Sequence, residues 1–174
     1  MEIYLDTSGS MPNPGAALNA MTLGAQVLAA SAIRKGGIVR AIVYSTEFVL
    51  SPWMYDEEVA RRFLLRYYGG GTSYPWQLLG KLAAERDDVI RVVVSDSDFL
   101  YNCDEKGGKE ALAGGVARSR RFVAMLALPR GHEDAARQRM GPASKDARFR
   151  LVPVHELGQF GEMAAALARG LFGA

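Results

Sequence analysis

Cysteine and histidine are scarce in this chain of 174 residues, which contains one cysteine, Cys103, and two histidines. A single cysteine excludes an internal disulfide and a thiolate metal cluster, and is typical of a reducing compartment. No stretch approaches the ~18 consecutive apolar residues of a membrane-spanning helix. The N-terminus also lacks the charged segment and apolar run of a secretory signal. We therefore expect a cytoplasmic protein with no membrane contact.

An excess of charge of one sign is also missing. Lys and Arg number 21 and Asp and Glu number 19, which gives a net charge of +2. The densest basic cluster, "ARSRR" at 117–121, is typical of a solvated helix end, whereas electrostatic binding of nucleic acid needs several phosphate contacts at once. Direct nucleic-acid binding is therefore not expected.

The length and the hydrophobic content of 49% fit one globular domain with its own core. "MEIYLD" has the pattern of a buried strand that begins at residue 1, although chain ends are usually loose. We therefore expect residues 1–174 to be a single domain from the C-terminal part of a longer protein.

Short apolar runs alternate with segments of helical periodicity. Strands are predicted at 3–6, 38–46, 48–51, 89–96, 122–128 and 148–154, and helices at 15–34, 57–67, 75–86, 109–118, 132–140 and 156–172. This alternation predicts an α/β fold, with a Rossmann-like doubly wound, mainly parallel sheet and helices on both faces. The short link before residues 48–51 leaves no room for a crossover and predicts one antiparallel strand at an edge.

Oxygen-bearing side chains gather where three predicted loops meet the carboxyl ends of the strands, the usual ligand position in doubly wound sheets. "DTSGSM" follows the first strand, "GGGTS" precedes the helix at 75–86, and "VVVSD" ends the most apolar strand. The side chains concerned are Asp6, Ser8, Ser10, Thr72 and Asp96.

All five side chains offer oxygen, which hard divalent cations prefer, whereas zinc or copper would call for His or Cys. The spacing of Asp6, Ser8 and Ser10 lets alternate side chains leave one side of an extended loop. Gly9 lets that loop turn without steric cost. We therefore predict a site for Mg²⁺, with Mn²⁺ or Ca²⁺ as alternatives.

The motifs "DTSGSM", "GGGT" and "VVVSD", in this order, resemble the metal-ion-dependent adhesion site of the von Willebrand factor A (VWA) family. The predicted order of strands and helices extends the resemblance to nearly the whole chain. The resemblance implies that Ser8, Ser10 and, in the ligand-competent state, Thr72 bind the metal directly, while Asp6 and Asp96 act mainly through water. Ser97 follows Asp96 where the family more often has glycine.

The family resemblance also implies a function in binding proteins. In the family, the open position on the metal commonly accepts Asp or Glu from a partner protein. Neutral hydroxyl ligands suit that role because they leave much of the charge of the cation uncancelled. Met11 and Tyr74 flank the loops, and we expect them to form an apolar collar that a partner covers.

Among VWA proteins, the chain looks most like intracellular bacterial and archaeal members, many of which work beside AAA+ ATPases of the MoxR or chelatase type. The resemblance therefore implies an adaptor for such an ATPase.

A second hypothesis is a metal-dependent hydrolase. It is disfavoured because the loops hold no general base beyond Asp6 and Asp96, so we expect no enzyme activity. A third is an RNA-associated module like that of Ro-type proteins, against which the near-neutral charge argues.

Simpler interpretations remain for the same residues. "DTSGS" is also typical of a turn followed by a helix cap, and Thr72, Ser73 and Asp96 could each cap a helix. Asp98 completes a "DSD" like that of haloacid-dehalogenase-type phosphatases. That motif requires a threonine at the position of Leu100 and normally follows the first strand.

Overall fold

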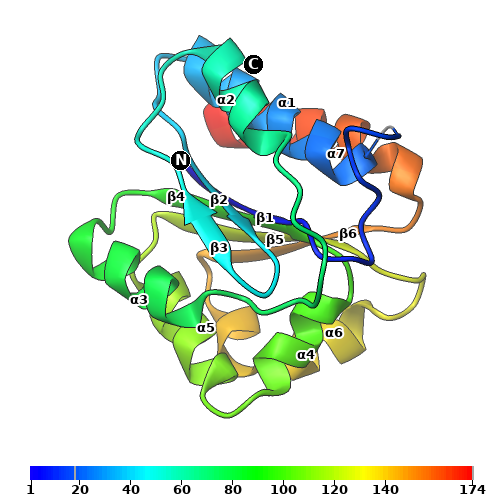
Figure 1. The fold of residues 1–174 in the computed structure, drawn as a ribbon. Coiled ribbons are helices and arrows are strands. Elements are labelled where there is room, and N and C mark those ends of the chain that lie inside the picture. The colour runs from blue at the N-terminus through cyan, green and yellow to red at the C-terminus, as the bar shows by residue number, and fades with distance from the viewer. Residues whose placement is uncertain (18, 174) are drawn as a thin grey trace.

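The computed structural model describes residues 1–17 and 19–173, and an open six-stranded sheet forms their centre (Figure 1). From edge to edge the strands are β3 (Phe48–Leu50), β2 (Arg40–Tyr44), β1 (Glu2–Asp6), β4 (Ile90–Ser95), β5 (Arg121–Ala127) and β6 (Phe149–Val154). All neighbouring strands are parallel except β2 and β3, which are antiparallel. The predicted fold class is confirmed, including the antiparallel edge strand.

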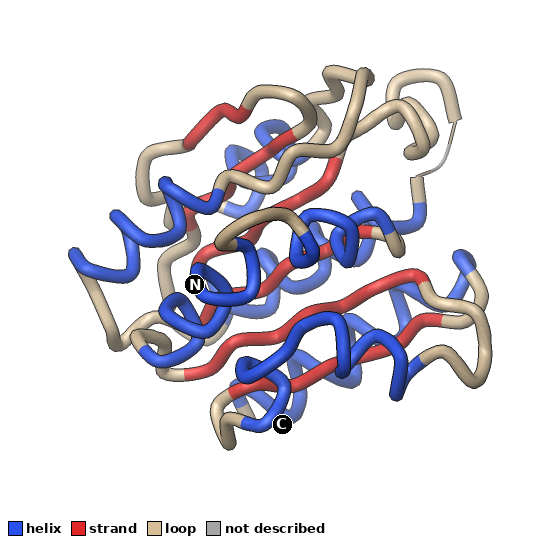
Figure 2. The backbone as a smooth tube through the Cα atoms, turned by 90° about the horizontal axis from the view of Figure 1, so that it is seen from below, coloured by secondary structure: helices blue, strands red, loops and turns tan. Residues whose placement is uncertain are grey.

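Helices cover both faces of the sheet (Figures 1 and 2). The buried side chains of α1, α2 and α7 share one core, and those of α3, α4, α5 and α6 share the other. The α-helices are α1 (Ala20–Arg34), α2 (Glu57–Leu64), α3 (Trp76–Glu85), α4 (Asp98–Asp104), α5 (Gly108–Ala117), α6 (Glu133–Met140) and α7 (Phe160–Phe172). Short 3₁₀ helices occupy Gly141–Lys145 and Leu157–Gln159.

Alternation along β1 explains how the strands enter both cores. Ile3 and Leu5 belong to the core that contains α1 and α7, whereas Tyr4 belongs to the core on the opposite face. Because helices cover both faces, β1 is buried along its whole length, and β4 and β5 are buried except at their ends. Their sequences are therefore largely apolar, with Arg91 as an exception in β4.

The helices show four main differences from the prediction, one of which is that α7 begins at Phe160 rather than Glu156, because Leu157–Gln159 form a 3₁₀ helix. The first helix begins at Ala20 rather than Gly15, because the Asn19 side chain accepts hydrogen bonds from the backbone N–H groups of Met21 and Thr22 and caps it there. Helix α2 ends at Leu64, three residues before the predicted end at Tyr67. Helix α4 was not predicted, because its seven residues are too few for a helical period to stand out.

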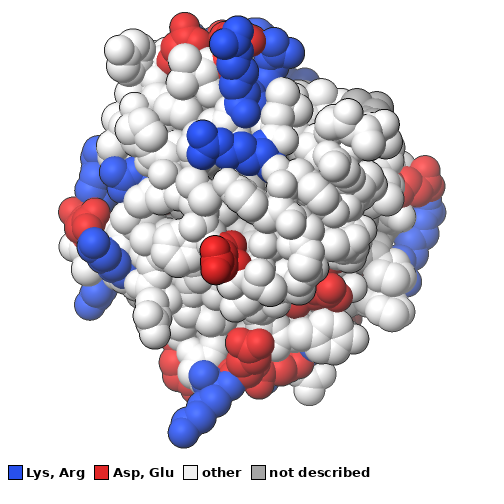
Figure 3. Space-filling view, viewed as in Figure 1, with Lys and Arg blue, Asp and Glu red and all other residues white. Residues whose placement is uncertain are grey.

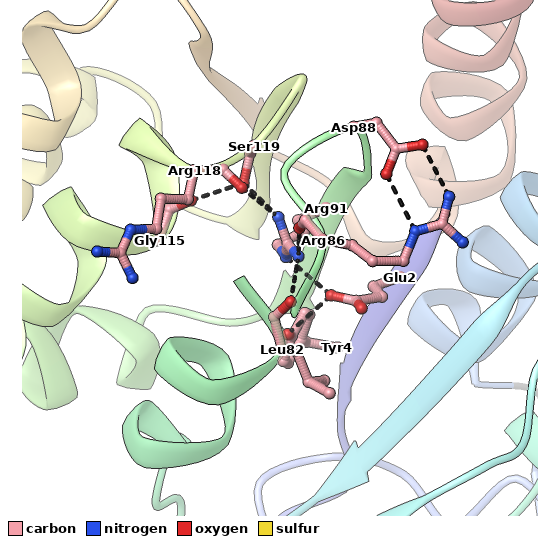
Figure 4. A network of polar contacts seen from close by, with 9 residues as sticks. All are labelled: Glu2, Tyr4, Leu82, Arg86, Asp88, Arg91, Gly115, Arg118 and Ser119. Atoms are coloured by element: carbon pink, nitrogen blue, oxygen red, sulfur yellow. Dashed lines mark hydrogen bonds and ion pairs between the residues drawn. The ribbon is translucent and has the colours of Figure 1, made fainter. Parts of the chain in front are cut away.

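A buried ion pair holds the amino ends of the central strands (Figure 4). Arg91 on β4 and Glu2 on β1 are 0% and 1% exposed, and Arg91 Nε donates to Glu2 Oε2 at 2.8 Å. The remaining guanidinium N–H groups donate to Ser119 Oγ and to the carbonyl groups of Leu82, Arg86 and Arg118. Every polar group of Arg91 is therefore satisfied, which a buried charge requires.

In the described part of the chain, no helix has the length and apolar character needed to cross a membrane.

Candidate metal centre

Asp6 is the last residue of β1, and two hydrogen bonds set the orientation of its buried carboxylate. Oδ1 accepts from the backbone N–H of Ser8 at 2.9 Å, and Oδ2 accepts from Ser95 Oγ at 2.6 Å. Burial raises the pKa of Asp6 above its ordinary value, and the nearby Asp96 carboxylate adds to the increase, although both hydrogen bonds act against it. The site therefore favours any positive charge that offsets this carboxylate.

The two serines after β1 lie on the same side of their loop, as their spacing predicts. Ser8 Oγ and Ser10 Oγ are 3.1 Å apart. Ser8 is buried beneath the loop, whereas Ser10 is exposed. The pair thus presents two neutral oxygens between the interior and the surface.

The glycine-rich segment before Thr72 is hydrogen-bonded to the loop after β1. Gly69 N donates to Thr7 O at 2.9 Å, and Gly9 N donates to Gly70 O at 2.7 Å. Gly69 and Gly70 have φ values of +66° and +80°, a region that glycine enters without steric cost. These contacts hold the segment that carries half-buried Thr72 against the loop that carries Ser8 and Ser10.

Helix capping does not account for Thr72. Helix α3 begins after Pro75, and no side chain caps its N-terminus. The interpretation of Thr72 or Ser73 as its cap is therefore wrong. The following residue, Tyr74, is held instead by Asn102, whose Oδ1 accepts from Tyr74 N at 2.7 Å.

Asp96 lies directly after β4, the neighbour of β1, so its carboxylate and that of Asp6 leave the same edge of the sheet. Asp96 Oδ1 accepts from the backbone N–H of Asp98 at 2.8 Å, a local turn that leads into α4. Burial, together with the nearby Asp96 carboxylate, raises the pKa of Asp98. Negative charge is therefore concentrated at this edge.

Two polar residues of the site were missed. Ser95 is fully buried and donates to Asp6. The sequence feature that could have indicated Ser95 is a single hydroxyl residue at the end of an apolar strand. A buried hydroxyl at such a position requires a hydrogen-bond partner. Asn102 joins the Asp98 carbonyl to the Tyr74 amide. It carried no signal, because its helix was not predicted.

The prediction of an exposed collar formed by Met11 and Tyr74 needs correction, since these side chains are only 4% and 3% exposed. Tyr74 belongs to an aromatic cluster and packs with its ring centroid 5.5 Å from that of Tyr4 and 4.4 Å from that of Trp76. Met11 belongs to the core that contains α1 and α7, and Tyr74 belongs to the opposite core. Their positions in the sequence do not reveal this burial.

The chemistry of these donors fits a hard cation. Among the described residues, no ion pair involves Asp6 or Asp96, so both carboxylates lack a cationic partner. The same part of the chain contains no group of three or more His, Cys, Asp or Glu side chains placed to hold a metal. A cation at this edge would depend on hydroxyl oxygens as well as carboxylates, which excludes a soft-metal site.

Comparison with solved structures identifies proteins that share the fold of this chain. The chain is similar to a von Willebrand factor type A protein from Catenulispora acidiphila, with a TM-score of 0.68 and 12% identity over 99% of this chain and 42% of that one. It is also similar to the conserved hypothetical protein BatB from Bacteroides thetaiotaomicron (TM-score 0.61, 13% identity, 98% and 95% of the two chains). An aerotolerance-related membrane protein from Bacteroides fragilis aligns with a TM-score of 0.57 and 14% identity over 97% of this chain and 98% of its own.

The fold is therefore that of VWA domains, as the motifs predicted. No protein-family model matches the sequence. No curated protein matches it either. The chain spans less than half the length of the Catenulispora protein, so the likeness extends to the fold and not to the activity of that whole protein.

Proposed function

We propose that this chain is a metal-dependent binding module, in which a Mg²⁺ ion recruits an acidic side chain of a partner protein. The observation that carries the proposal is the pair of carboxylates, Asp6 and Asp96, which lack a cationic partner among the described residues and lie at the sheet edge where the loops bearing three hydroxyl residues meet. Ser8, Ser10 and Thr72 would bind the cation directly, and the two aspartates would hold it through water.

The choice of ligands favours recruitment over a closed structural site. Mg²⁺ prefers about six oxygens and readily retains water. Three neutral hydroxyls would leave most of its charge available to an incoming carboxylate, and a charge-assisted contact of this kind is strong when partly desolvated. When bound, the ion would supply this electrostatic attraction.

Thr72 is suited to respond to a partner. The backbone is anchored on either side of Thr72, by Gly70 O on one side and by Ser73 N, which donates to Ser45 O at 2.8 Å, on the other. Only Gly71 and Thr72 lie between these anchors. A small adjustment there could exchange direct and water-mediated contact with the metal, and a carboxylate would shift that balance by its differential affinity for the two states.

We further propose that this partner protein belongs to a complex containing an AAA+ ATPase of the MoxR or chelatase type. It rests on the resemblance of the motifs to intracellular VWA proteins. An ATPase encoded beside this chain would be the first partner to test by co-purification in Mg²⁺ and in EDTA.

Calorimetric titration with Mg²⁺ and Mn²⁺ tests the metal site. The wild type should bind one ion, and Asp6→Asn should bind it much more weakly. Asp87→Asn is the matched control, because Asp87 is exposed and follows α3 at the opposite end of the sheet. Equal titration curves for the wild type and Asp6→Asn would contradict the proposal. Metal-dependent phosphoester hydrolysis lost in Asp96→Asn would favour the hydrolase hypothesis instead.

A further inference from the structure

A hollow of about 250 Å³ lies beside the candidate metal centre, and its walls include Thr46, Phe48, Val49, Tyr68, Gly69 and Gly70. We call it the Phe48–Tyr68 hollow. Its volume is below the range of roughly 300–1,000 Å³ typical of small-molecule sites. It is therefore better matched to one side chain than to a cofactor.

The hollow and the metal centre share the same backbone. Gly69 and Gly70, which form one wall, are the residues hydrogen-bonded to the loop after β1. Thr46 packs on this segment, with its methyl carbon 3.5 Å from the position that a Cβ on Gly71 would occupy. A peptide bound at the metal would therefore bring a residue a few positions along its own sequence to the hollow.

Strand β3, which forms the opposite wall, has an open edge. Ser45 N donates to Glu47 O, and Ser51 N donates to Ala41 O. Between them, hydrogen-bonded and non-hydrogen-bonded residue pairs of β2 and β3 alternate. Phe48 and Leu50 therefore direct their backbone N–H and C=O groups away from β2. Among the described residues no strand pairs with this side of β3. Such an edge can accept an extended peptide segment.

The surface chemistry identifies which part of the segment enters the hollow. Phe48 and Tyr68 are 47% and 51% exposed, although they are large apolar side chains. Among the described residues that line the hollow, Glu47 is the one that carries a charge, so a second carboxylate would be repelled there. Figure 3 shows few charged side chains in the middle of the face seen there, with Lys and Arg mostly toward its rim. An apolar side chain fits this environment and an acidic one does not.

From these observations we propose that the Phe48–Tyr68 hollow receives an apolar side chain of the same extended partner segment whose Asp or Glu reaches the metal. The inference rests on the proposed function and adds to it the chemistry of the partner. The recognised segment has one acidic residue with a large apolar residue close to it in sequence. The metal supplies the attraction to charge, and the hollow supplies selectivity for the neighbouring residue.

Capped hexapeptides of defined sequence test this proposal. Each peptide carries one Asp. A Phe residue, or Ala in the matched counterpart, occupies one of the four positions within two residues of that Asp. Binding to the isotopically labelled chain in Mg²⁺ is followed by nuclear magnetic resonance. The best Phe peptide should bind about tenfold more tightly than its Ala counterpart, as expected for burial of one large apolar side chain. Equal affinity of all Phe and Ala pairs would overturn the inference.

A matched pair of variants locates the effect. Tyr68→Ser should abolish the advantage of Phe over Ala but leave Mg²⁺ affinity unchanged. Tyr55→Ser is the same substitution at a residue that is 80% exposed and adjoins Met54, which bridges to Val39 before β2 begins. It should retain the advantage. An advantage that survives Tyr68→Ser would show that the hollow is not the apolar subsite.

Two further outcomes separate this inference from the proposed function. If EDTA, or Asn in place of Asp in the peptide, leaves binding unchanged, the metal-dependent function fails and the inference fails with it. If Mg²⁺-dependent binding of Asp peptides persists without any preference for Phe, only the inference fails. If sedimentation shows a dimer that Tyr68→Ser dissociates, the occupant is a second copy of the chain, which also overturns the proposal.

Discussion

Replacement of Arg91 by methionine should destabilise the fold more than any surface substitution. Arg91 and Glu2 are 0% and 1% exposed, so removal of the guanidinium leaves a buried carboxylate. Within the described part of the chain, its remaining side-chain donor is Tyr4 Oη, at 3.2 Å. The carbonyls of Arg86 and Arg118 also lose the Arg91 donor, whereas the carbonyl of Leu82 keeps the backbone N–H of Arg86. Breaking a buried pair in this way costs about 3–5 kcal/mol.

This cost can be converted into a melting temperature. A domain of this length loses roughly 2–4 °C per kcal/mol, so Arg91→Met should melt roughly 6–20 °C below the wild type. Thermal and urea unfolding followed by circular dichroism measure the loss. Arg34→Met is the control. Arg34 also pairs with a carboxylate, Glu57, at 2.7 Å, but its side chain is 70% exposed and the pair is screened by water.

The double variant Glu2→Gln/Arg91→Met completes the test. It removes the unpaired charge, so it should be more stable than Arg91→Met alone, and the double-mutant cycle should give a favourable coupling energy between the two residues. A loss below about 1 kcal/mol for Arg91→Met, or a double variant less stable than Arg91→Met, would refute the reasoning that an uncompensated buried charge dominates the cost.

Three further predictions concern the candidate metal centre. Burial and the nearby Asp96 carboxylate raise the pKa of Asp6 in the folded chain. The contribution of Asp6 to the free energy of unfolding is therefore greatest below the pKa that Asp6 has in the unfolded chain, and it falls as the pH rises through its pKa in the folded chain. Asp6→Asn should therefore melt higher than the wild type in EDTA at pH 7 yet bind Mg²⁺ poorly, and a lower melting temperature would contradict this. Gly9→Ala would place a Cβ 3.0 Å from Gly70 O, and calorimetry should show Mg²⁺ affinity reduced severalfold; unchanged affinity would show that the loop adapts. Thr72→Ala should weaken binding of an Asp peptide at saturating Mg²⁺ more than it weakens binding of the metal, and the reverse order would exclude a role for Thr72 in sensing the partner.

Most of the architecture could be predicted because its signals are local. The apolar run of β4 and the helical periodicity of α1 each lie within one segment, and their alternation restricts the topology to a doubly wound sheet. The rule that ligands bind at the carboxyl ends of such strands then placed Asp6 and Asp96 at one edge. The same local reasoning failed for α4, because a seven-residue helix repeats its pattern fewer than two full times.

The sequence by itself determined the order of the strands, the antiparallel edge strand and the all-oxygen chemistry of the candidate site, since each depends on residue type and spacing along the chain. Tertiary structure alone decided that Ser95 donates to Asp6, because that contact requires β1 and β4 to be neighbours in register. It also decided that Tyr74 is buried while Phe48 and Tyr68 are exposed. The physical reason is that burial of a side chain depends on which distant segments pack over it, and the residues next to it in the chain do not specify those contacts.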